Sequence, residues 1–148
     1  MEKKKILLVE DSKDDILLIQ RAFDKTKLTE KFELIIAQDG NQALSYLHDT
    51  DILSISQQDK IPMILLLDLN LPKINGFEIL QRIRSNDKTK LIPVIVFTSS
   101  KEDQDITKSY LLGANSYVRK PIDSGKFTSV LQQIVSYWGD VNEVPVKK

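Results

Sequence analysis

The sequence contains no cysteine and a single histidine among its 148 residues. Without cysteine, the protein has no disulfide bond, no thiolate nucleophile and no sulfur ligand for a metal. One histidine, His48, is too few for a histidine-based metal centre, and we interpret it as an ordinary polar residue near a helix end. Any metal site in this protein must therefore use oxygen ligands.

The sequence also lacks an excess of charge of either sign and any long apolar run. Its 21 basic residues are balanced by 21 acidic residues, so no overall field attracts nucleic acid or anionic lipid. The apolar run Ile6–Val9 ends at two acids and is too short for a signal sequence. No run approaches the roughly 20 residues of a membrane span. We therefore expect a cytoplasmic protein that binds neither nucleic acid nor membrane.

Short apolar runs alternate with amphipathic segments along the whole chain. The apolar runs predict strands at residues 5–9, 32–37, 61–67, 93–98 and 115–119. The amphipathic segments predict helices at residues 13–26, 41–48, 76–86, 101–112 and 123–138. Because each strand is followed by a helix, the sequence predicts a doubly wound α/β fold, (βα)5, with a parallel five-stranded sheet.

The expected strand order is 2-1-3-4-5, the flavodoxin-like order that is common in this fold class. The pattern leaves room for one domain at residues 1–138, followed by a C-terminal tail at residues 139–148. Residues 49–60 are polar and weakly patterned, and they predict a long surface loop whose composition does not identify a role.

Polar side chains follow several of the predicted strands at the point where each strand ends. Glu10 and Asp11 follow the first strand, and Asp68 follows the third. Thr98 ends the fourth strand, and Lys120 follows the fifth. Because ligands of open parallel sheets bind beyond the carboxyl ends of the strands, we expect these five side chains to form one site.

These residue types suit phosphoryl transfer assisted by a hard cation. Three crowded carboxylates repel one another, and a bound Mg²⁺ or Mn²⁺ ion would relieve the repulsion. Asp68 ends the most buried strand and is the candidate nucleophile, while the backbone carbonyl of Asn70 is a further candidate ligand. The hydroxyl of Thr98 can donate to a phosphate oxygen, and the amine of Lys120 can pair with it.

A simpler interpretation exists for the first pair of acids. Glu10 and Asp11 could stabilise the N-terminus of the helix that follows them, since acidic groups interact favourably with that end of the helix dipole. Asp14 and Asp15 already suit that role. We therefore expect these two later acids to cap the helix and the two earlier acids to bind metal.

Four segments together resemble the receiver domain of two-component response regulators. They are ILLVEDS at 6–12, LLLDLNLPKINGFEIL at 65–80, PVIVFTSS at 93–100 and GANSYVRKP at 113–121. The segments occur in the order of the family, at about its spacing, and cover nearly the whole chain. Each one alone would be a weak signal, but their combination is highly specific.

The resemblance implies that Asp68 is the phosphoacceptor and that its phosphoryl group comes from a phosphohistidine on a sensor histidine kinase. It also implies a Mg²⁺ site formed by Glu10, Asp11, Asp68 and the Asn70 carbonyl. The chain has Glu10 where much of the family has aspartate. Because glutamate is one methylene longer, this difference affects the detail of the coordination only.

The resemblance further implies that Thr98 and Lys120 contact the phosphoryl group and that Tyr117 reorients when Thr98 moves. An ordinary half-buried strand aromatic is the alternative for Tyr117. The bond between Lys120 and Pro121 resembles a cis peptide of the family, and X-Pro bonds are those for which cis is accessible. Such a domain is not an enzyme acting on other substrates: it catalyses its own phosphorylation and often its own dephosphorylation.

The chain is also similar to short receivers that serve phytochrome-type histidine kinases. The supporting features are EDSKDD at 10–15, the loop at 49–60 and the segment from Trp138 to Pro145. In that subgroup the domain stands alone. Phosphorylation is then expected to switch an interaction surface, and a homodimer is possible, through the fourth helix, fifth strand and fifth helix. Some of Phe127, Val130 and Leu131 could face such a partner.

Two other functions remain as alternatives. The first is a receiver-like module that binds partners without phosphorylation. The second is a Mg²⁺-dependent phosphatase of the haloacid-dehalogenase type, which needs Asp-x-Asp after its first strand, where this chain has Glu10–Asp11. A flavin carrier would need a phosphate-binding loop at the same place, and no glycine-rich nucleotide motif occurs.

Overall fold

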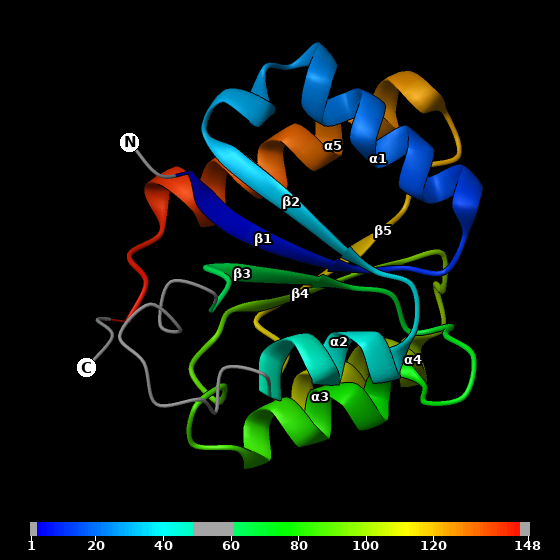
Figure 1. The fold of residues 1–148 in the computed structure, drawn as a ribbon. Coiled ribbons are helices and arrows are strands. Elements are labelled where there is room, and N and C mark those ends of the chain that lie inside the picture. The colour runs from blue at the N-terminus through cyan, green and yellow to red at the C-terminus, as the bar shows by residue number, and fades with distance from the viewer. Residues whose placement is uncertain (1–2, 49–60, 146–148) are drawn as a thin grey trace.

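The computed structural model describes residues 3–48 and 61–145 and contains one parallel sheet of five strands (Figure 1). The strands are β1 (Lys4–Val9), β2 (Phe32–Ala37), β3 (Ile64–Leu67), β4 (Val94–Thr98) and β5 (Ser116–Arg119). Their order is β2-β1-β3-β4-β5, and every neighbouring pair is parallel. The predicted fold class and strand order are therefore confirmed.

Helices cover both faces of the sheet. They are α1 (Lys13–Lys25), α2 (Gly40–His48), α3 (Gly76–Ser85), α4 (Asp103–Leu111) and α5 (Ser124–Ser136), with a short 3₁₀ turn at Leu28–Glu30. Helices α1 and α5 lie on one face, and α2, α3 and α4 lie on the other (Figure 1). The helices in the described ranges include none with both the length and the apolar character needed to span a bilayer.

The core consists of two apolar layers because side chains alternate along each strand. In β1, Ile6 and Leu8 pack in the layer that contains residues of α1 and α5. Leu7 and Val9 belong to the layer that contains residues of α2 and α3. Strands β3 and β4 are buried along their entire length, as expected for central strands of a parallel sheet. This burial fixes the positions of the residues at the ends of these strands.

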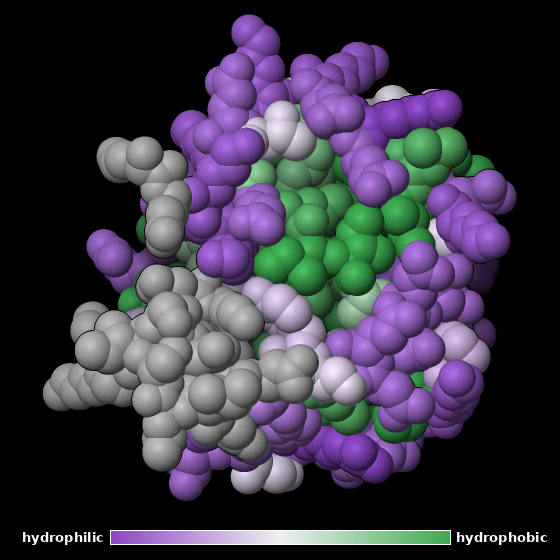
Figure 2. Space-filling view, viewed as in Figure 1, coloured by the Kyte–Doolittle hydropathy of each residue, from purple (hydrophilic) through white to green (hydrophobic). Residues whose placement is uncertain are grey.

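Strand β2 lies at one edge of the sheet and pairs only with β1 in the described part of the chain. Its residues Leu34, Ile35 and Ile36 are half-buried. Figure 2 shows apolar side chains gathered on this face of the molecule, over β2 and between α1 and α2. The helices and side chains that bury the central strands therefore cover β2 less completely.

The packed part of the chain continues past Trp138, where the sequence predicts the tail to begin. A π-helical turn spans Tyr137–Val141, and within it Gly139 is buried. A Cβ atom at Gly139 would lie 2.5 Å from the ring of Phe32. The carbonyl of Gly139 also accepts a hydrogen bond of 3.2 Å from Lys4 Nζ. The predicted loop at 49–60 lies outside the described residues.

The side chain of Arg84 joins α3 to the loops that lead into β4 and β5. It donates hydrogen bonds to the carbonyls of Gly113, Lys90 and Ile92 and to Asn115 Oδ1, at 2.8, 3.0, 2.8 and 2.8 Å respectively. These acceptors need the forked donors of a guanidinium group. Arg84 is therefore a structural residue, which its place in a charged helix segment did not indicate.

We expect Arg84→Lys to lower the free energy of unfolding by about 2–3 kcal/mol, because one ammonium group cannot reach all four acceptors. Chemical denaturation measures this change. Arg82→Lys on the same helix is the matched control, because the polar contact of Arg82 within residues 3–48 and 61–145 is an exposed ion pair with Glu78. The control should change stability by less than about 0.5 kcal/mol. Equal effects of the two substitutions would contradict the structural role of Arg84.

Candidate functional site

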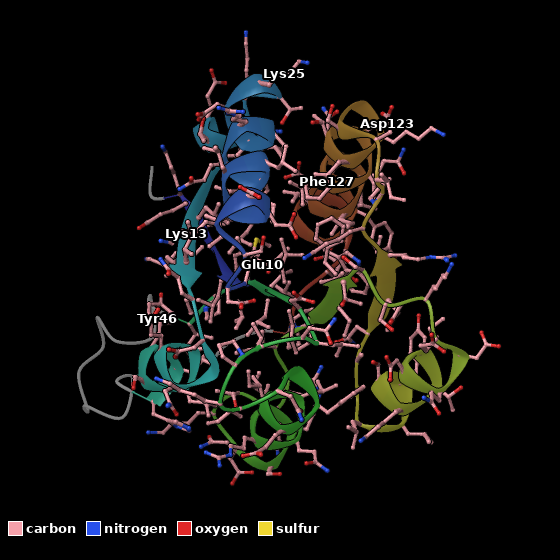
Figure 3. All side chains as sticks on the ribbon, turned by 90° about the vertical axis from the view of Figure 1, so that its right-hand side faces the viewer. Glu10, Lys13, Lys25, Tyr46, Asp123 and Phe127 are labelled. Atoms are coloured by element: carbon pink, nitrogen blue, oxygen red, sulfur yellow. The ribbon has the colours of Figure 1, made fainter. Side chains whose placement is uncertain are left out.

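The ladder of backbone hydrogen bonds continues one residue past the strands and aligns the site residues. Glu10 N donates to Ala37 O at 3.0 Å, Asp68 N donates to Val9 O at 3.1 Å, and Lys120 N donates to Thr98 O at 2.8 Å. Figure 3 views the molecule from this side, with Glu10 labelled where β1 ends. The sheet register therefore brings Glu10, Asp68 and Lys120 to the same edge.

Three carboxylates meet at this edge. Glu10, Asp11 and Asp68 each offer one oxygen atom, and these atoms lie within 4.8 Å of one another. Glu10 and Asp68 are buried, whereas Asp11 is exposed. The predicted convergence of the three acids is confirmed, and Asp11 lies on the side of the cluster that is open to solvent.

The clustering makes ionisation of Glu10 unfavourable. Burial and the nearby charge of Asp68 raise the pKa of Glu10 from 4.5 to about 7, even though hydrogen bonds from Lys120 and the Ser12 N–H favour its charged form. Burial disfavours a charge, and a like charge nearby disfavours it further. The metal-free cluster thus carries more negative charge than its surroundings compensate.

Lys120 supplies the positive charge of the site. Its buried Nζ donates to Glu10 Oε1, to Asp15 Oδ2 at 2.7 Å and to Asp68 Oδ2 at 3.4 Å. Burial alone would lower the pKa of Lys120, but the hydrogen bonds to Asp15 and Glu10 and the charge of Asp68 outweigh it, so the pKa is raised. The amine therefore stays protonated and binds three carboxylates at once.

The acid cluster fits a divalent cation. All three side chains present oxygen, the atom that hard cations prefer, and their clustering gathers three such ligands around one point. Such an ion would also offset the repulsion that raises the pKa of Glu10. Asn70 is exposed and its N–H lies 3.4 Å from Asp68 Oδ1. The proposed role of its carbonyl as a metal ligand stays a prediction.

Thr98 contributes a buried hydroxyl with no hydrogen-bond partner in the described residues. Its side chain is fully buried at the end of β4. The register pairs Leu67 with Val96, so Asp68 and Thr98 both lie just beyond this pair on adjacent strands. A buried hydroxyl without a hydrogen-bond partner destabilises the folded protein. An anionic group bound at the acid cluster could accept the hydrogen of Thr98 and remove this destabilisation.

Tyr117 connects β5 to the loop after β4. Its hydroxyl donates to the carbonyl of Ser100 at 2.8 Å, and its ring is half-buried. Burial raises the pKa of this hydroxyl despite the hydrogen bond to Ser100. The side chain of Ser100 in turn donates to Asp105 Oδ2 at 2.6 Å. Tyr117 is therefore tied to the segment that leads from Thr98 into α4, and its reorientation stays a prediction.

One expectation from the sequence is wrong, and another holds in part. The peptide bond between Lys120 and Pro121 is trans, as are all others in the described ranges. The trans form is the intrinsically favoured one, and with it Lys120 already reaches the acids. Asp14 and Asp15 lie in the first turn of α1 and outside the acid cluster, as expected, but the cap itself is Ser12, which accepts from Asp15 N at 3.3 Å, and the carboxylate of Asp15 binds Lys120.

Asp15 and Gly76 are site residues that the sequence reasoning missed. Asp15 lies in the first turn of α1, whereas Asp11 precedes the Ser12 N-cap, so their spacing in the sequence did not place Asp15 at the site. A Cβ atom at Gly76 would lie 2.5 Å from the carbonyl oxygen of Asp68 and 2.7 Å from the Cα of Leu69. Glycine therefore allows α3 to begin directly against the backbone that carries Asp68.

Comparison with known proteins agrees with this geometry. Residues 6–132 match the family model of the response regulator receiver domain. The chain is similar to response regulator Rcp1 of Synechocystis, with 38% identity over 96% of this chain and 93% of Rcp1. It is also similar to the probable methanogenesis regulatory protein FilR2 of Methanothrix harundinacea, with 36% identity over 95% of this chain and 86% of FilR2.

Solved structures give the same result. The phosphorylated cyanobacterial phytochrome response regulator RcpA has a TM-score of 0.84 and 36% identity, covering 98% of this chain and all of RcpA. The Mn²⁺-bound form of Rcp1 has a TM-score of 0.82 and 38% identity, covering 97% of this chain and 99% of that one. Both the family resemblance and the likeness to phytochrome response regulators are therefore confirmed.

The raised pKa of Glu10 predicts how the stability of the metal-free protein depends on pH. The folded protein holds a proton on Glu10 up to about pH 7, whereas the unfolded chain releases it near pH 4.5. Because the folded state binds more protons between these values, its stability should fall as pH rises from 5 to 8, by roughly 3 kcal/mol at most. Melting temperatures measured in a chelator test this prediction.

Glu10→Gln is the control for this measurement, because it removes the titrating group and should flatten the decline. Addition of Mg²⁺ should also reduce the decline, since a cation favours the ionised carboxylate. If the stability of the Glu10→Gln protein fell by the same amount as pH rises, titrating groups other than Glu10 would be responsible for the decline.

Proposed function

This chain belongs to the response regulator receiver domain family, and we propose that Asp68 accepts a phosphoryl group beside a Mg²⁺ ion bound by Glu10, Asp11 and Asp68. The observation that carries the proposal is the position of Asp68. Its buried carboxylate belongs to the acid cluster and faces the amine of Lys120. Mn²⁺ would suit these oxygen ligands as well, and the similar protein Rcp1 has a Mn²⁺-bound form.

In the proposed reaction an oxygen of Asp68 attacks the phosphorus of a phosphohistidine. The new O–P bond forms as the P–N bond breaks, and the imidazole leaves with the electron pair. Lys120 pairs with an oxygen of the transferred group, and the hydroxyl of Thr98 donates to another. The divalent cation supplies charge neutralisation when it is bound. Glu10 and Asp11 hold that cation and take no part in bond formation.

The proposed phosphodonor is a sensor histidine kinase of the phytochrome type. Support comes from the similarity over nearly the full chain to RcpA, a cyanobacterial phytochrome response regulator. The receiver acts on no other substrate in this proposal. Its chemistry is limited to its own phosphorylation and to hydrolysis of its own aspartyl phosphate, so its output depends on a change of surface.

The proposed output surface is formed by α4, β5 and α5, and it is also the proposed homodimer interface. Tyr110, Leu111 and Ile122 are exposed apolar residues in this region, with Leu111 81% exposed. Tyr117 links the surface to the site, because its hydroxyl is bound to the loop that follows Thr98. Phe127 and Leu131, which the sequence left open as partner contacts, are instead buried in the core; Val130 is only half-buried.

We expect Asp68→Asn to abolish phosphorylation. Wild-type protein incubated with acetyl phosphate and Mg²⁺ should gain the mass of one phosphoryl group, and hydroxylamine should remove it because an acyl phosphate is the product. Intact-mass spectrometry measures the gain, and transfer from a phosphorylated phytochrome-type kinase provides a second donor. The variant should show neither signal, since the amide is not a nucleophile.

Asp24→Asn is the control, because Asp24 is an exposed carboxylate near the far end of α1. It should be phosphorylated like the wild type. Labelling of the Asp68→Asn protein would refute the assignment of the phosphoacceptor. A wild-type protein that both donors leave unlabelled, while it still binds partners, would favour the phosphorylation-independent module.

We expect Leu111→Ser to weaken homodimerisation about tenfold, since burial of an exposed leucine contributes about 1–2 kcal/mol. Light scattering over a range of protein concentrations, with and without acetyl phosphate, measures the dissociation constant. Leu91→Ser is the matched control, because Leu91 is also an exposed leucine but lies between α3 and β4, outside the three elements that form this surface. Equal effects of the two substitutions would place the interface elsewhere.

A further inference from the structure

Asp15 is a further carboxylate at the site. It is not one of the three acids of the cluster, and it is not the proposed phosphoacceptor. It extends from the first turn of α1, and its Oδ2 lies 2.7 Å from Lys120 Nζ. The side chain of Asp15 is 25% exposed, whereas that of Lys120 is 5% exposed. The lysine side of this ion pair is therefore buried. The charges of Asp15 and Lys120 attract each other more strongly there than the charges of a surface pair do.

The ammonium group of Lys120 has three N–H donors, and three carboxylates accept hydrogen bonds from it. A phosphoryl group on Asp68 would be a new acceptor, so at least one present bond must break. A cation bound by the acid cluster would draw on Glu10 and Asp68 but not on Asp15, which is absent from that cluster. Asp15 is thus the acceptor that stays available to Lys120 in every state of the site.

We propose that Asp15 is a positioning residue that competes with the phosphoryl group for the amine of Lys120 and thereby slows phosphorylation of Asp68. This inference rests on the proposed function. In the unphosphorylated protein Asp15 holds the amine on the side of α1. During phosphorylation the amine must turn towards the transferred group against this attraction, and the charge of Asp15 also repels an anionic phosphodonor.

The test compares Asp15→Asn with Asp14→Asn. Asp14 is the neighbouring exposed carboxylate in the same helical turn, so its substitution removes an equal charge from the start of α1. We expect Asp15→Asn to increase the initial rate of phosphorylation by acetyl phosphate about three- to tenfold, in line with the loss of one partly buried ion pair. Asp14→Asn should stay within about twofold of the wild type.

Three further measurements separate positioning from a structural effect. Mg²⁺ affinity of Asp15→Asn should stay within about twofold of the wild type, because Asp15 lies outside the cation cluster. Asp15→Glu keeps the carboxylate and should bring the rate back towards the wild-type value. Asp15→Ser removes the charge differently and should also be fast, which keeps the test informative if the asparagine variant folds poorly.

The outcomes distinguish this inference from the proposed function. If the wild type takes no phosphoryl group from either donor, the proposed function fails. If the wild type is phosphorylated but Asp15→Asn is no faster than Asp14→Asn, or is slower, the positioning role of Asp15 is overturned while the phosphoacceptor assignment stands. Loss of Mg²⁺ affinity in Asp15→Asn would identify Asp15 as part of the cation site instead.

Discussion

The site depends on one ammonium group buried among carboxylates. Lys120 Nζ donates to Glu10, Asp15 and Asp68, and no other cation pairs with these acids in the described part of the chain. Burial and the charge of Asp68 raise the pKa of Glu10 even with this partner, so without Lys120 the buried carboxylates would lose their charge more readily. The sheet makes the arrangement possible, because residues far apart in sequence follow adjacent strands and arrive at one edge.

Much of the fold could be predicted because its strands and helices follow from the spacing of apolar residues along short segments of the chain. Strands β3 and β4 are continuous apolar runs, and only a sheet covered on both faces buries such runs. The element ends were harder to place, because a few polar contacts determine them. The third strand begins at Ile64 rather than residue 61, and Pro62, which has no N–H for the ladder, lies before it. The tail could not be placed from composition, because the packing of Gly139 against Phe32 joins distant segments.

The candidate site was predictable to the extent that its residues follow strands. Glu10, Asp68 and Lys120 could be assigned because the carboxyl end of each strand is visible in the sequence. Asp15 could not, since an acid in the first turn of a helix already has a sufficient explanation in the helix dipole. The partners of Arg84 were equally hidden, because carbonyl groups of distant loops leave no trace in the sequence.

The site contains two imbalances that a phosphoryl group and its cation would correct together. The acid cluster has an excess of negative charge that a divalent cation would offset, and Thr98 has a buried hydroxyl without an acceptor in the described residues. An unsatisfied buried hydroxyl destabilises the protein by about 1–3 kcal/mol. A phosphoryl group bound with its cation would add an acceptor for Thr98 and a partner for Lys120 together. Because these corrections arise only in the occupied site, a phosphoryl group and its cation would stabilise the occupied state relative to the empty one, which is how a ligand biases a switch.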